Sequence, residues 1–261
     1  MRRLRRLVEK RVERRREGVL VAEGPKVIAA ALDAGAEIEA IYAAPRAERS
    51  AMASAVLERA SDLGIEIFRF APGVIDTVAD AQTPQPLIAT VRTIERGIDA
   101  ASDGDAVLVL VDVRDPGNLG AILRVADATG IDAVICCVGC VDWQSPKAVR
   151  ASAGSCFALR IVDDEEPETA LAELRVIGFR TISTAAQGGT AHDEVDYRKK
   201  VAVVLGNEAS GLPENLHALV DQVVTIPMSG STESLNVATA TAVICYERVI
   251  QKKLAADGAL R

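Results

Sequence analysis

The chain has 261 residues, of which 49% are hydrophobic and 26% charged, a composition typical of a globular protein with an apolar core. No stretch approaches the run of about 20 apolar residues that a membrane span needs, and no apolar signal core follows the N-terminus. We therefore expect a cytoplasmic protein without a membrane segment, whose five cysteines are reduced thiols.

The net charge of −7 is unevenly distributed along the chain. Residues 1–17 contain nine Arg or Lys and three Glu, a net charge of +6, which leaves −13 for the remaining residues. A basic segment of this kind can bind RNA phosphates, and its candidate RNA-binding side chains are Arg2, Arg3, Arg5, Arg6, Arg11, Arg14 and Arg15. The same segment has the pattern of a helix with one apolar face, formed by Leu4, Leu7, Val8 and Val12. The two interpretations are compatible.

After this basic helix, residues 19–94 alternate between short strands and helices. The segment 19–35 predicts a strand, a Gly-Pro turn and a helix ended by Gly35. Further strands are predicted at 38–45, 65–70 and 86–92, with a helix at 50–64. Residues 1–94 therefore form a small α/β domain. The polar segment 95–105 has no apolar period and is predicted to be a linker.

From residue 106 the strands become longer and more apolar. Residues 106–113 are almost continuously apolar, as in a parallel strand buried on both faces. A turn at 114–120, a helix ended by Gly130 and a second strand at 131–139 follow, and helices begin near Pro146 and Pro167. The last elements are strands at 179–186, 201–206 and 223–228 and a long helix at 234–254. The alternation predicts an α/β fold for 106–261, a mostly parallel sheet with helices on both faces.

Three strands of this sheet end in loops of unusual composition: 114–124, 205–216 and 226–236. Each combines side chains that can hydrogen-bond or carry charge with glycines, at positions 117, 120, 206, 211 and 230, which permit positive φ and close approach to a ligand. Because ligands of open parallel sheets bind beyond the carboxyl ends of the strands, we expect these loops to form one site.

Several common sites do not fit this pattern. The loops lack the G-x-G-x-x-G dinucleotide fingerprint, and GNEASG lacks the Lys-Ser/Thr pair of a phosphate loop. There is no G-x-S-x-G elbow, and His192 and His217 are the only histidines available to a serine triad. Cysteines 136, 137, 140 and 156 lack a paired C-x-x-C arm, so we expect buried core thiols and no metal site.

The three loops resemble the motifs of the SpoU/TrmH family of RNA ribose 2′-O-methyltransferases, within the SPOUT superfamily. They read DPGNLGAILRVADATG (115–130), LGNEASGLPENL (205–216) and IPMSGSTESLNVATATAVICYE (226–247), and SPKAVRASAGSCF (145–157) also fits. The first half is similar to the small ribosomal-protein-like RNA-binding domain of the family, in AEGPKVIAAALDAG and TPQPLIATV. Ala209 and Ala238 stand where glycine and serine are common, and Pro86 where glycine is often found.

The resemblance implies S-adenosylmethionine as the cofactor, RNA as the partner, and a deep trefoil knot and a homodimer interface in the second domain. It places Arg124 beside the target ribose, together with Asn118, Glu208, Ser234 and Asn236 as the other catalytic candidates. The implied cofactor-binding residues are Leu205, Gly206, Asn207, Gly211, Ile226, Met228, Ser234 and Leu235. Simpler roles stay open at this point: a surface ion pair for Arg124, a helix cap for Asn118 or Ser234, and the capping of a turn for Glu208.

The function predicted in this way is the S-adenosylmethionine-dependent 2′-O-methylation of a ribose in structured RNA. The additional N-terminal domain favours ribosomal RNA, in antibiotic resistance or in a housekeeping modification. A tRNA ribose, a base as the methyl acceptor, and a catalytically silent RNA-binding or ribosome-assembly factor are the alternatives.

Overall fold

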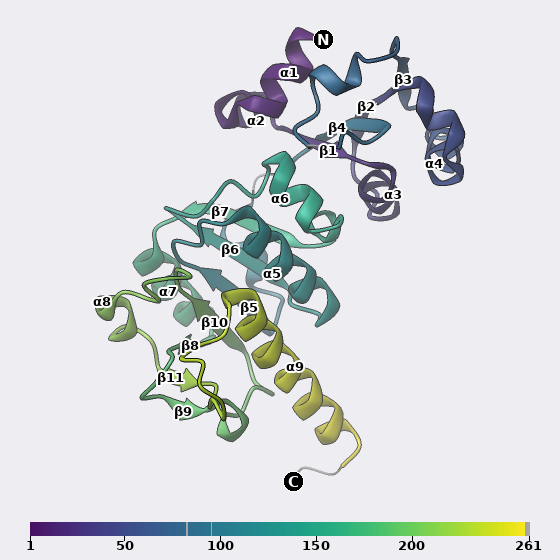
Figure 1. The fold of residues 1–261 in the computed structure, drawn as a ribbon. Coiled ribbons are helices and arrows are strands. Elements are labelled where there is room, and N and C mark those ends of the chain that lie inside the picture. The colour runs from purple at the N-terminus through teal and green to yellow at the C-terminus, as the bar shows by residue number, and fades with distance from the viewer. Residues whose placement is uncertain (82, 95, 259–261) are drawn as a thin grey trace. The chain divides into compact units, whose positions relative to one another are not determined.

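The computed structural model of the protein describes residues 1–81, 83–94 and 96–258 (Figure 1). The chain forms two compact units, and each combines two stretches of sequence. Unit 1 contains Met1–Ile94 with Asp142–Ala158, and unit 2 contains Glu95–Val141 with Leu159–Arg261. Residues 142–158 thus lie in unit 1, although they fall within the segment 106–261 that the sequence predicts as the second domain.

Unit 1 is built on a four-stranded sheet in the order β1-β4-β2-β3. Its strands are β1 (Val19–Glu23), β2 (Ile38–Ala43), β3 (Glu66–Arg69) and β4 (Leu87–Arg92), of which β2 and β3 are parallel and the other neighbours antiparallel. The accompanying helices are α3 (Pro25–Asp33), α4 (Ala51–Asp62) and, from the inserted segment, α6 (Pro146–Ala151). The strands and helices predicted in residues 19–92 are confirmed.

The basic N-terminal segment forms two helices, α1 (Arg2–Glu9) and α2 (Arg11–Glu17), rather than one. The backbone of Lys10 between them is extended, with φ −121° and ψ 114°. Leu4, Leu7 and Val8 pack into the core of unit 1 as predicted, but Val12 is 74% exposed. The assignment of Val12 to the apolar face is wrong because the helical phase restarts after Lys10.

Unit 2 contains a seven-stranded sheet in the order β7-β6-β5-β10-β8-β11-β9, in which every neighbouring pair is parallel. The strands are β5 (Ala106–Leu110), β6 (Ala133–Cys137), β7 (Arg160–Glu165), β8 (Arg180–Thr184), β9 (Thr190–Ala191), β10 (Val201–Leu205) and β11 (Gln222–Thr225). The predicted α/β fold with a mostly parallel sheet is confirmed.

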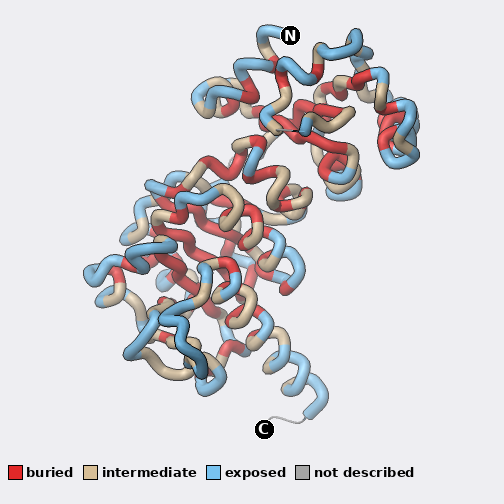
Figure 2. Tube along the Cα trace, in the orientation of Figure 1, coloured by how far each residue is buried: buried red, intermediate tan, exposed pale blue. Residues whose placement is uncertain are grey.

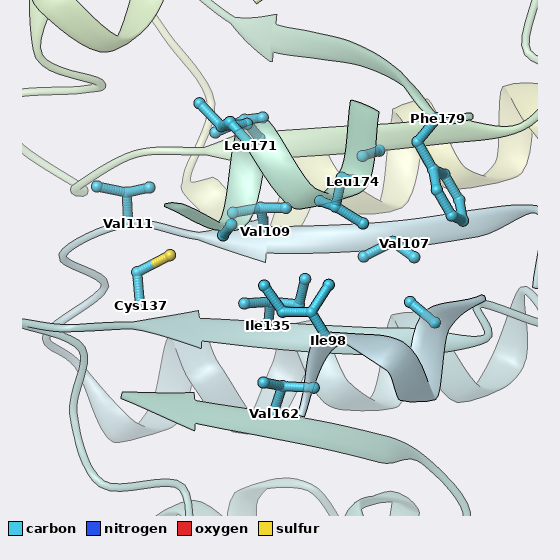
Figure 3. Packing of buried hydrophobic residues seen from close by; sticks show 14 of the residues in the cluster. Ile98, Val107, Val109, Val111, Ile135, Cys137, Val162, Leu171, Leu174 and Phe179 are labelled. Atoms are coloured by element: carbon cyan, nitrogen blue, oxygen red, sulfur yellow. The ribbon is translucent and has the colours of Figure 1, made fainter. Parts of the chain in front are cut away.

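Helices cover both faces of this sheet: α5 (Pro116–Ala128), α7 (Pro167–Val176) and α9 (Val237–Ala256). On one face, Val107, Val109 and Ile135 pack against Leu171 and Leu174 of α7 (Figure 3). Alternate residues of the same strands point to the other face, where α5 and α9 lie side by side (Figure 1). The central strands β5, β6 and β10 are therefore apolar at every position and buried along their length (Figure 2).

Some elements differ from the predicted pattern. The short strands β7 and β9 and the one-turn helix α8 (Glu214–His217) were not predicted. Within the predicted linker, η3 (Ile98–Ala101) is a 3-10 helix whose Ile98 and Ala101 belong to the core of unit 2. The cysteines are buried as expected. Among the described residues, no helix combines the length and the apolar composition of a membrane span.

Candidate functional site

The loops after β5, β10 and β11 emerge at one edge of the sheet of unit 2, because these strands are all parallel. Hydrogen bonds join all three. The convergence that the sequence predicts is therefore present for one side chain from each loop: Asn118, Glu208 and Asn236.

The first loop is shorter than predicted, because α5 begins at Pro116. Asp115 is the N-cap: its Oδ1 accepts a 2.8 Å hydrogen bond from the backbone N–H of Asn118. Gly117 and Gly120 are helical residues and not parts of a turn. Asn118 is thus the third residue of the helix, in its first turn, and the alternative that it serves as the cap is wrong.

Asn118 is the centre of a polar network between the three loops. Its Nδ2 donates to Oε1 of Glu208 over 2.9 Å, and its Oδ1 accepts from Nδ2 of Asn236 over 2.9 Å. Glu208 also accepts from the backbone N–H groups of Arg114 (3.4 Å) and Asp115 (3.2 Å). Three of the five predicted catalytic residues are therefore in direct contact, although they are 90 and 118 positions apart.

The carboxyl group of Glu208 is held in its ionised form. Partial burial opposes ionisation, but hydrogen bonds from Asn118 and from nearby backbone N–H groups outweigh it and lower the pKa of Glu208. An ionised Glu208 can only accept hydrogen bonds, so it fixes which end of the Asn118 amide faces it.

The second loop is closed tightly by its own backbone. Asn207 and Gly211 exchange two backbone hydrogen bonds of 3.0 and 2.9 Å, and Gly211 has a left-handed φ of 68°. A Cβ on Gly206 would lie 2.3 Å from the backbone of Gly211 and Leu212, so only glycine fits there. The side-chain Oδ1 of Asn207 accepts from the backbone of Ala209, over 2.9 Å.

A cavity of about 370 Å³ lies between the second and third loops. Seven of the eight predicted cofactor-binding residues line it: Gly206, Asn207, Gly211, Ile226, Met228, Ser234 and Leu235. The eighth, Leu205, is fully buried in β10 and does not line it, because a strand that is covered on both faces has no free side. Glu208 also lines this cavity and joins it to the polar network.

The third loop ends at Asn236, which is the N-cap of α9. Its Oδ1 accepts a 2.9 Å hydrogen bond from the backbone N–H of Ala238. Ser234 is exposed and lies outside the helix, so the alternative that it caps α9 is wrong. It faces the cavity instead.

Arg124 does not join this cluster within one chain. It is exposed on α5, six residues beyond Asn118 and so about 9 Å further along the helix axis, and it does not line the cavity. Within the part of the chain that the structure describes, its side chain makes no hydrogen bond or ion pair, so the simple role of a surface ion pair is not seen.

Several residues near the cavity were not predicted. Thr184, His217 and Glu233 line it, and Nδ1 of His217 is 2.8 Å from Oγ of the buried Ser183. Glu233 belongs to the third motif, so its position in the sequence could have indicated it. His217 lies in a helix that the pattern does not predict.

The arginines of the basic segment differ widely in exposure. Arg14 is 4% exposed, pairs with Asp142 and donates to the carbonyl groups of Leu7 (2.7 Å) and Val8 (3.1 Å). Its prediction as an RNA-binding residue is wrong, because its guanidinium is buried and bonded within unit 1. Arg3 is partly exposed between Glu17 and Glu39, whereas Arg2, Arg5 and Arg6 are exposed.

Two family models match the chain. Residues 105–246 match the SpoU rRNA Methylase family, and residues 1–89 match the MRM3-like substrate binding domain.

Relatives of known name cover most of the chain. It is 34% identical over 188 residues to a 23S rRNA (guanosine(2553)-2′-O)-methyltransferase, RlmP, of Bacillus subtilis, covering 71% of this chain and 74% of RlmP. It is 30% identical over 254 residues to a 23S rRNA (uridine(2479)-2′-O)-methyltransferase of Streptomyces viridochromogenes, covering 94% of this chain and 88% of the relative.

A solved structure shares the complete architecture. The SpoU methyltransferase AviRb from Streptomyces viridochromogenes, crystallised in complex with the cofactor AdoMet, aligns with a TM-score of 0.83 at 28% identity over 97% of this chain and 98% of AviRb. The resemblance drawn from the three motifs is thus confirmed. The chain belongs to the SpoU rRNA methylase family.

Proposed function

We propose that this protein transfers the methyl group of S-adenosylmethionine to the 2′-hydroxyl of a ribose in ribosomal RNA. Two relatives that cover 71% and 94% of the chain are named 23S rRNA 2′-O-methyltransferases, and AviRb was crystallised in complex with AdoMet. The observation that carries the proposal is the cavity between the second and third loops, which borders the Asn118–Glu208–Asn236 network.

The cavity suits the methyl donor in size and charge. Its volume of about 370 Å³ is within the usual range for small-ligand sites. Glu208 and Glu233 on its wall complement a sulfonium cation, and Gly206 and Gly211 let backbone groups approach the ligand closely. When it is bound there, S-adenosylmethionine supplies an activated methyl group.

The polar network would act on the RNA. A ribose hydroxyl is a weak nucleophile, so the site must orient its oxygen and stabilise the negative charge that develops on it. Asn118 and Ser234 are neutral groups that can hold the hydroxyl. A guanidinium is a cation with five N–H donors and no acceptor, so we assign Arg124 the binding of phosphate and of developing charge rather than proton abstraction.

We further propose that unit 1 selects the RNA, and that the protein works in the cytoplasm as a knotted homodimer. Tyr246, Ile250 and Leu254 are exposed apolar residues four positions apart on α9, as expected of a helix that packs against a second copy. A dimer through this surface would bring in a second chain, whose Arg124 could complete the cluster. Light scattering of the purified protein tests the dimer.

The experiment that tests the function is transfer of tritiated methyl from S-adenosylmethionine to ribosomal RNA, followed by alkaline hydrolysis. Methylation of a 2′-hydroxyl leaves an alkali-resistant dinucleotide, whereas methylation of a base does not. Total tRNA as a competing substrate separates the tRNA alternative. A wild-type protein that binds both RNA and donor but transfers no methyl group would support the catalytically silent alternative. We expect the variant Arg124→Ala to bind the donor normally but to lose turnover.

A further inference from the structure

A second arginine lies at the carboxyl end of β5, at a position to which the motifs assign no role. The side chain of Arg114 is 72% exposed, and its Nε donates a 2.7 Å hydrogen bond to Oδ1 of Asp112. Within the described residues, this contact leaves both Nη groups without a partner. Because a guanidinium carries most of its N–H donors on these two atoms, Arg114 can bind a planar anion while it is held by Asp112.

The position of Asp112 is set by the wall of the cavity. Asp112 has a left-handed φ of 57°, which is uncommon for a residue with a side chain. Nδ2 of Asn207 donates to its carbonyl oxygen over 2.9 Å and to its carboxylate over 3.3 Å. Asn207 itself lines the cavity, so the carboxylate that holds Arg114 is anchored to the donor site.

The backbone of Arg114 is also part of the site. Its N–H donates to Oε2 of Glu208, whose other oxygen accepts from Asn118. Arg114 is therefore two hydrogen bonds, through Glu208, from Asn118, one of the side chains proposed to hold the ribose hydroxyl. A long arginine side chain that starts here would be able to contact a phosphate beside a ribose bound by Asn118.

The negative charge of unit 2 favours a cation at this edge. Its sequence holds 13 Arg or Lys against 23 Asp or Glu, a net charge of −10, whereas unit 1 has a net charge of +3. The edge around the site is itself acidic, with Asp112, Asp115, Glu208 and Glu233. RNA phosphates that approach this edge would be repelled unless cations are placed there.

We propose that the Nη groups of Arg114 bind a backbone phosphate of the substrate RNA next to the target ribose, and that Asp112 holds the guanidinium in place for this contact. The inference rests on the proposed function of the site. Arg114 positions the substrate and takes no part in the transfer of the methyl group.

The test compares Arg114→Gln with the wild type in ribosomal RNA methylation and in RNA filter binding at several salt concentrations. We expect KM for RNA to rise roughly 5- to 10-fold, while kcat and donor affinity stay close to wild type. The slope of log affinity against log salt should fall by about 1, the loss of one phosphate contact. Arg114→Lys should restore most of the slope, because it keeps the charge.

Arg198→Gln is the matched control. Arg198 forms the same kind of local pair, with its Nε 2.8 Å from Oδ1 of Asp196 two residues earlier, but it does not border the cavity or the polar network. Its loss should leave KM for RNA and the salt slope nearly unchanged.

Two results would overturn the proposal. One is an Arg114→Gln variant whose KM and salt slope match those of Arg198→Gln. The other is a variant that loses donor affinity and thermal stability with an unchanged salt slope, which would make the pair with Asp112 purely structural. Failure of the proposed function is distinct from both results, because the wild type would then transfer no methyl group to RNA. In that case RNA filter binding would still decide whether Arg114 contacts a phosphate.

Discussion

At the scale of single residues, Asn118 holds the site together because an amide is a donor at one end and an acceptor at the other. Ionised Glu208 can only accept, so Nδ2 of Asn118 must face it. Oδ1 of Asn118 must then accept from Asn236, whose own Oδ1 is used by the N–H of Ala238. Each group thus has one orientation that satisfies the others.

Replacing Asn118 should therefore reduce catalysis much more than donor binding. Asn118→Ala removes both hydrogen bonds, and Asn118→Asp places a second carboxylate against Glu208. We expect single-turnover methyl transfer to fall by about 100-fold in both, with donor affinity within about threefold of wild type, because Asn118 does not line the cavity. Calorimetry measures the donor affinity.

Asn215→Ala is the control for this prediction. Nδ2 of Asn215 also contacts a carboxylate, Glu168, over 3.4 Å, but on an exposed surface. It should transfer methyl at the wild-type rate. A rate for Asn118→Ala close to that of Asn215→Ala would contradict the proposed role.

The lowered pKa of Glu208 predicts a dependence of stability on pH. Burial opposes the shift, and the hydrogen bonds from Asn118 and the backbone outweigh it. A carboxyl group with a lowered folded-state pKa stabilises the fold fully above its unfolded-state value, about 4.3, and loses this contribution as the pH falls through the folded-state value. Glu208→Gln should thus be less stable than wild type at pH 7, and the difference should shrink at about pH 3.5. Urea unfolding at both pH values tests this, and a difference that is constant with pH would disprove it.

At the scale of elements, the turn after β10 depends on the absence of a side chain at Gly206. A Cβ there would lie 2.3 Å from backbone atoms of Gly211 and Leu212, which cannot rotate away. We expect Gly206→Ala to open the turn and to weaken donor binding by at least about tenfold, measured by calorimetry.

Gly230→Ala, in the third loop, provides the comparison. An added Cβ at Gly230 meets no atom within 4 Å, and the residue has no left-handed φ. Donor binding should be close to that of wild type. Equal effects at Gly206 and Gly230 would show that the packing of the second loop does not control the cavity.

The elements also show how far the sequence predicts this structure. Buried strands such as β5 and β10 were predicted because they are continuously apolar and end at polar loops. The start of α5 was missed because Pro116, Gly117 and Gly120 suggest a turn, whereas proline suits the first helical position when Asp115 caps the helix. β7 was missed because half of it is acidic, and β9 because two residues carry too little pattern.

The candidate site residues lie together in some cases and apart in others, for different physical reasons. Asn118, Glu208 and Asn236 meet because parallel strands bring their carboxyl ends to one edge, which a pattern of strands can indicate. Arg124 lies on a side of α5 that does not face the cavity. The spacing of residues in the sequence does not show which side of a helix faces a ligand site. Neither does spacing reveal that Arg14 is buried.

At the scale of the whole molecule, the chain returns to unit 1 between β6 and β7. Residues 142–158 bring two charged side chains into contact with buried groups of the N-terminal segment. Asp142 pairs with Arg14, and Arg150 pairs with Glu23 over 2.8 Å, where Glu23 is 2% exposed. Unit 1 is therefore completed by a segment that lies, in the sequence, between the adjacent strands β6 and β7 of the methylase sheet.

The buried pair of Arg14 and Asp142 should contribute strongly to the stability of unit 1. The two side chains are 4% and 8% exposed, and Arg14 also holds the last carbonyl groups of α1. Asp142→Ala leaves an uncompensated buried guanidinium, so we expect a loss of about 3 kcal/mol or more in the free energy of unfolding, measured with urea. Asp33→Ala breaks the exposed pair of Asp33 and Arg59, whose two side chains are 68% and 45% exposed, and should cost less than about 1 kcal/mol.

If the unpaired charge of Arg14 causes the loss of stability in Asp142→Ala, the double variant Arg14→Met/Asp142→Leu should recover much of that loss, because apolar side chains of similar size need no partner. A double variant as unstable as Asp142→Ala would show instead that the hydrogen bonds of Arg14 to Leu7 and Val8 are what α1 requires.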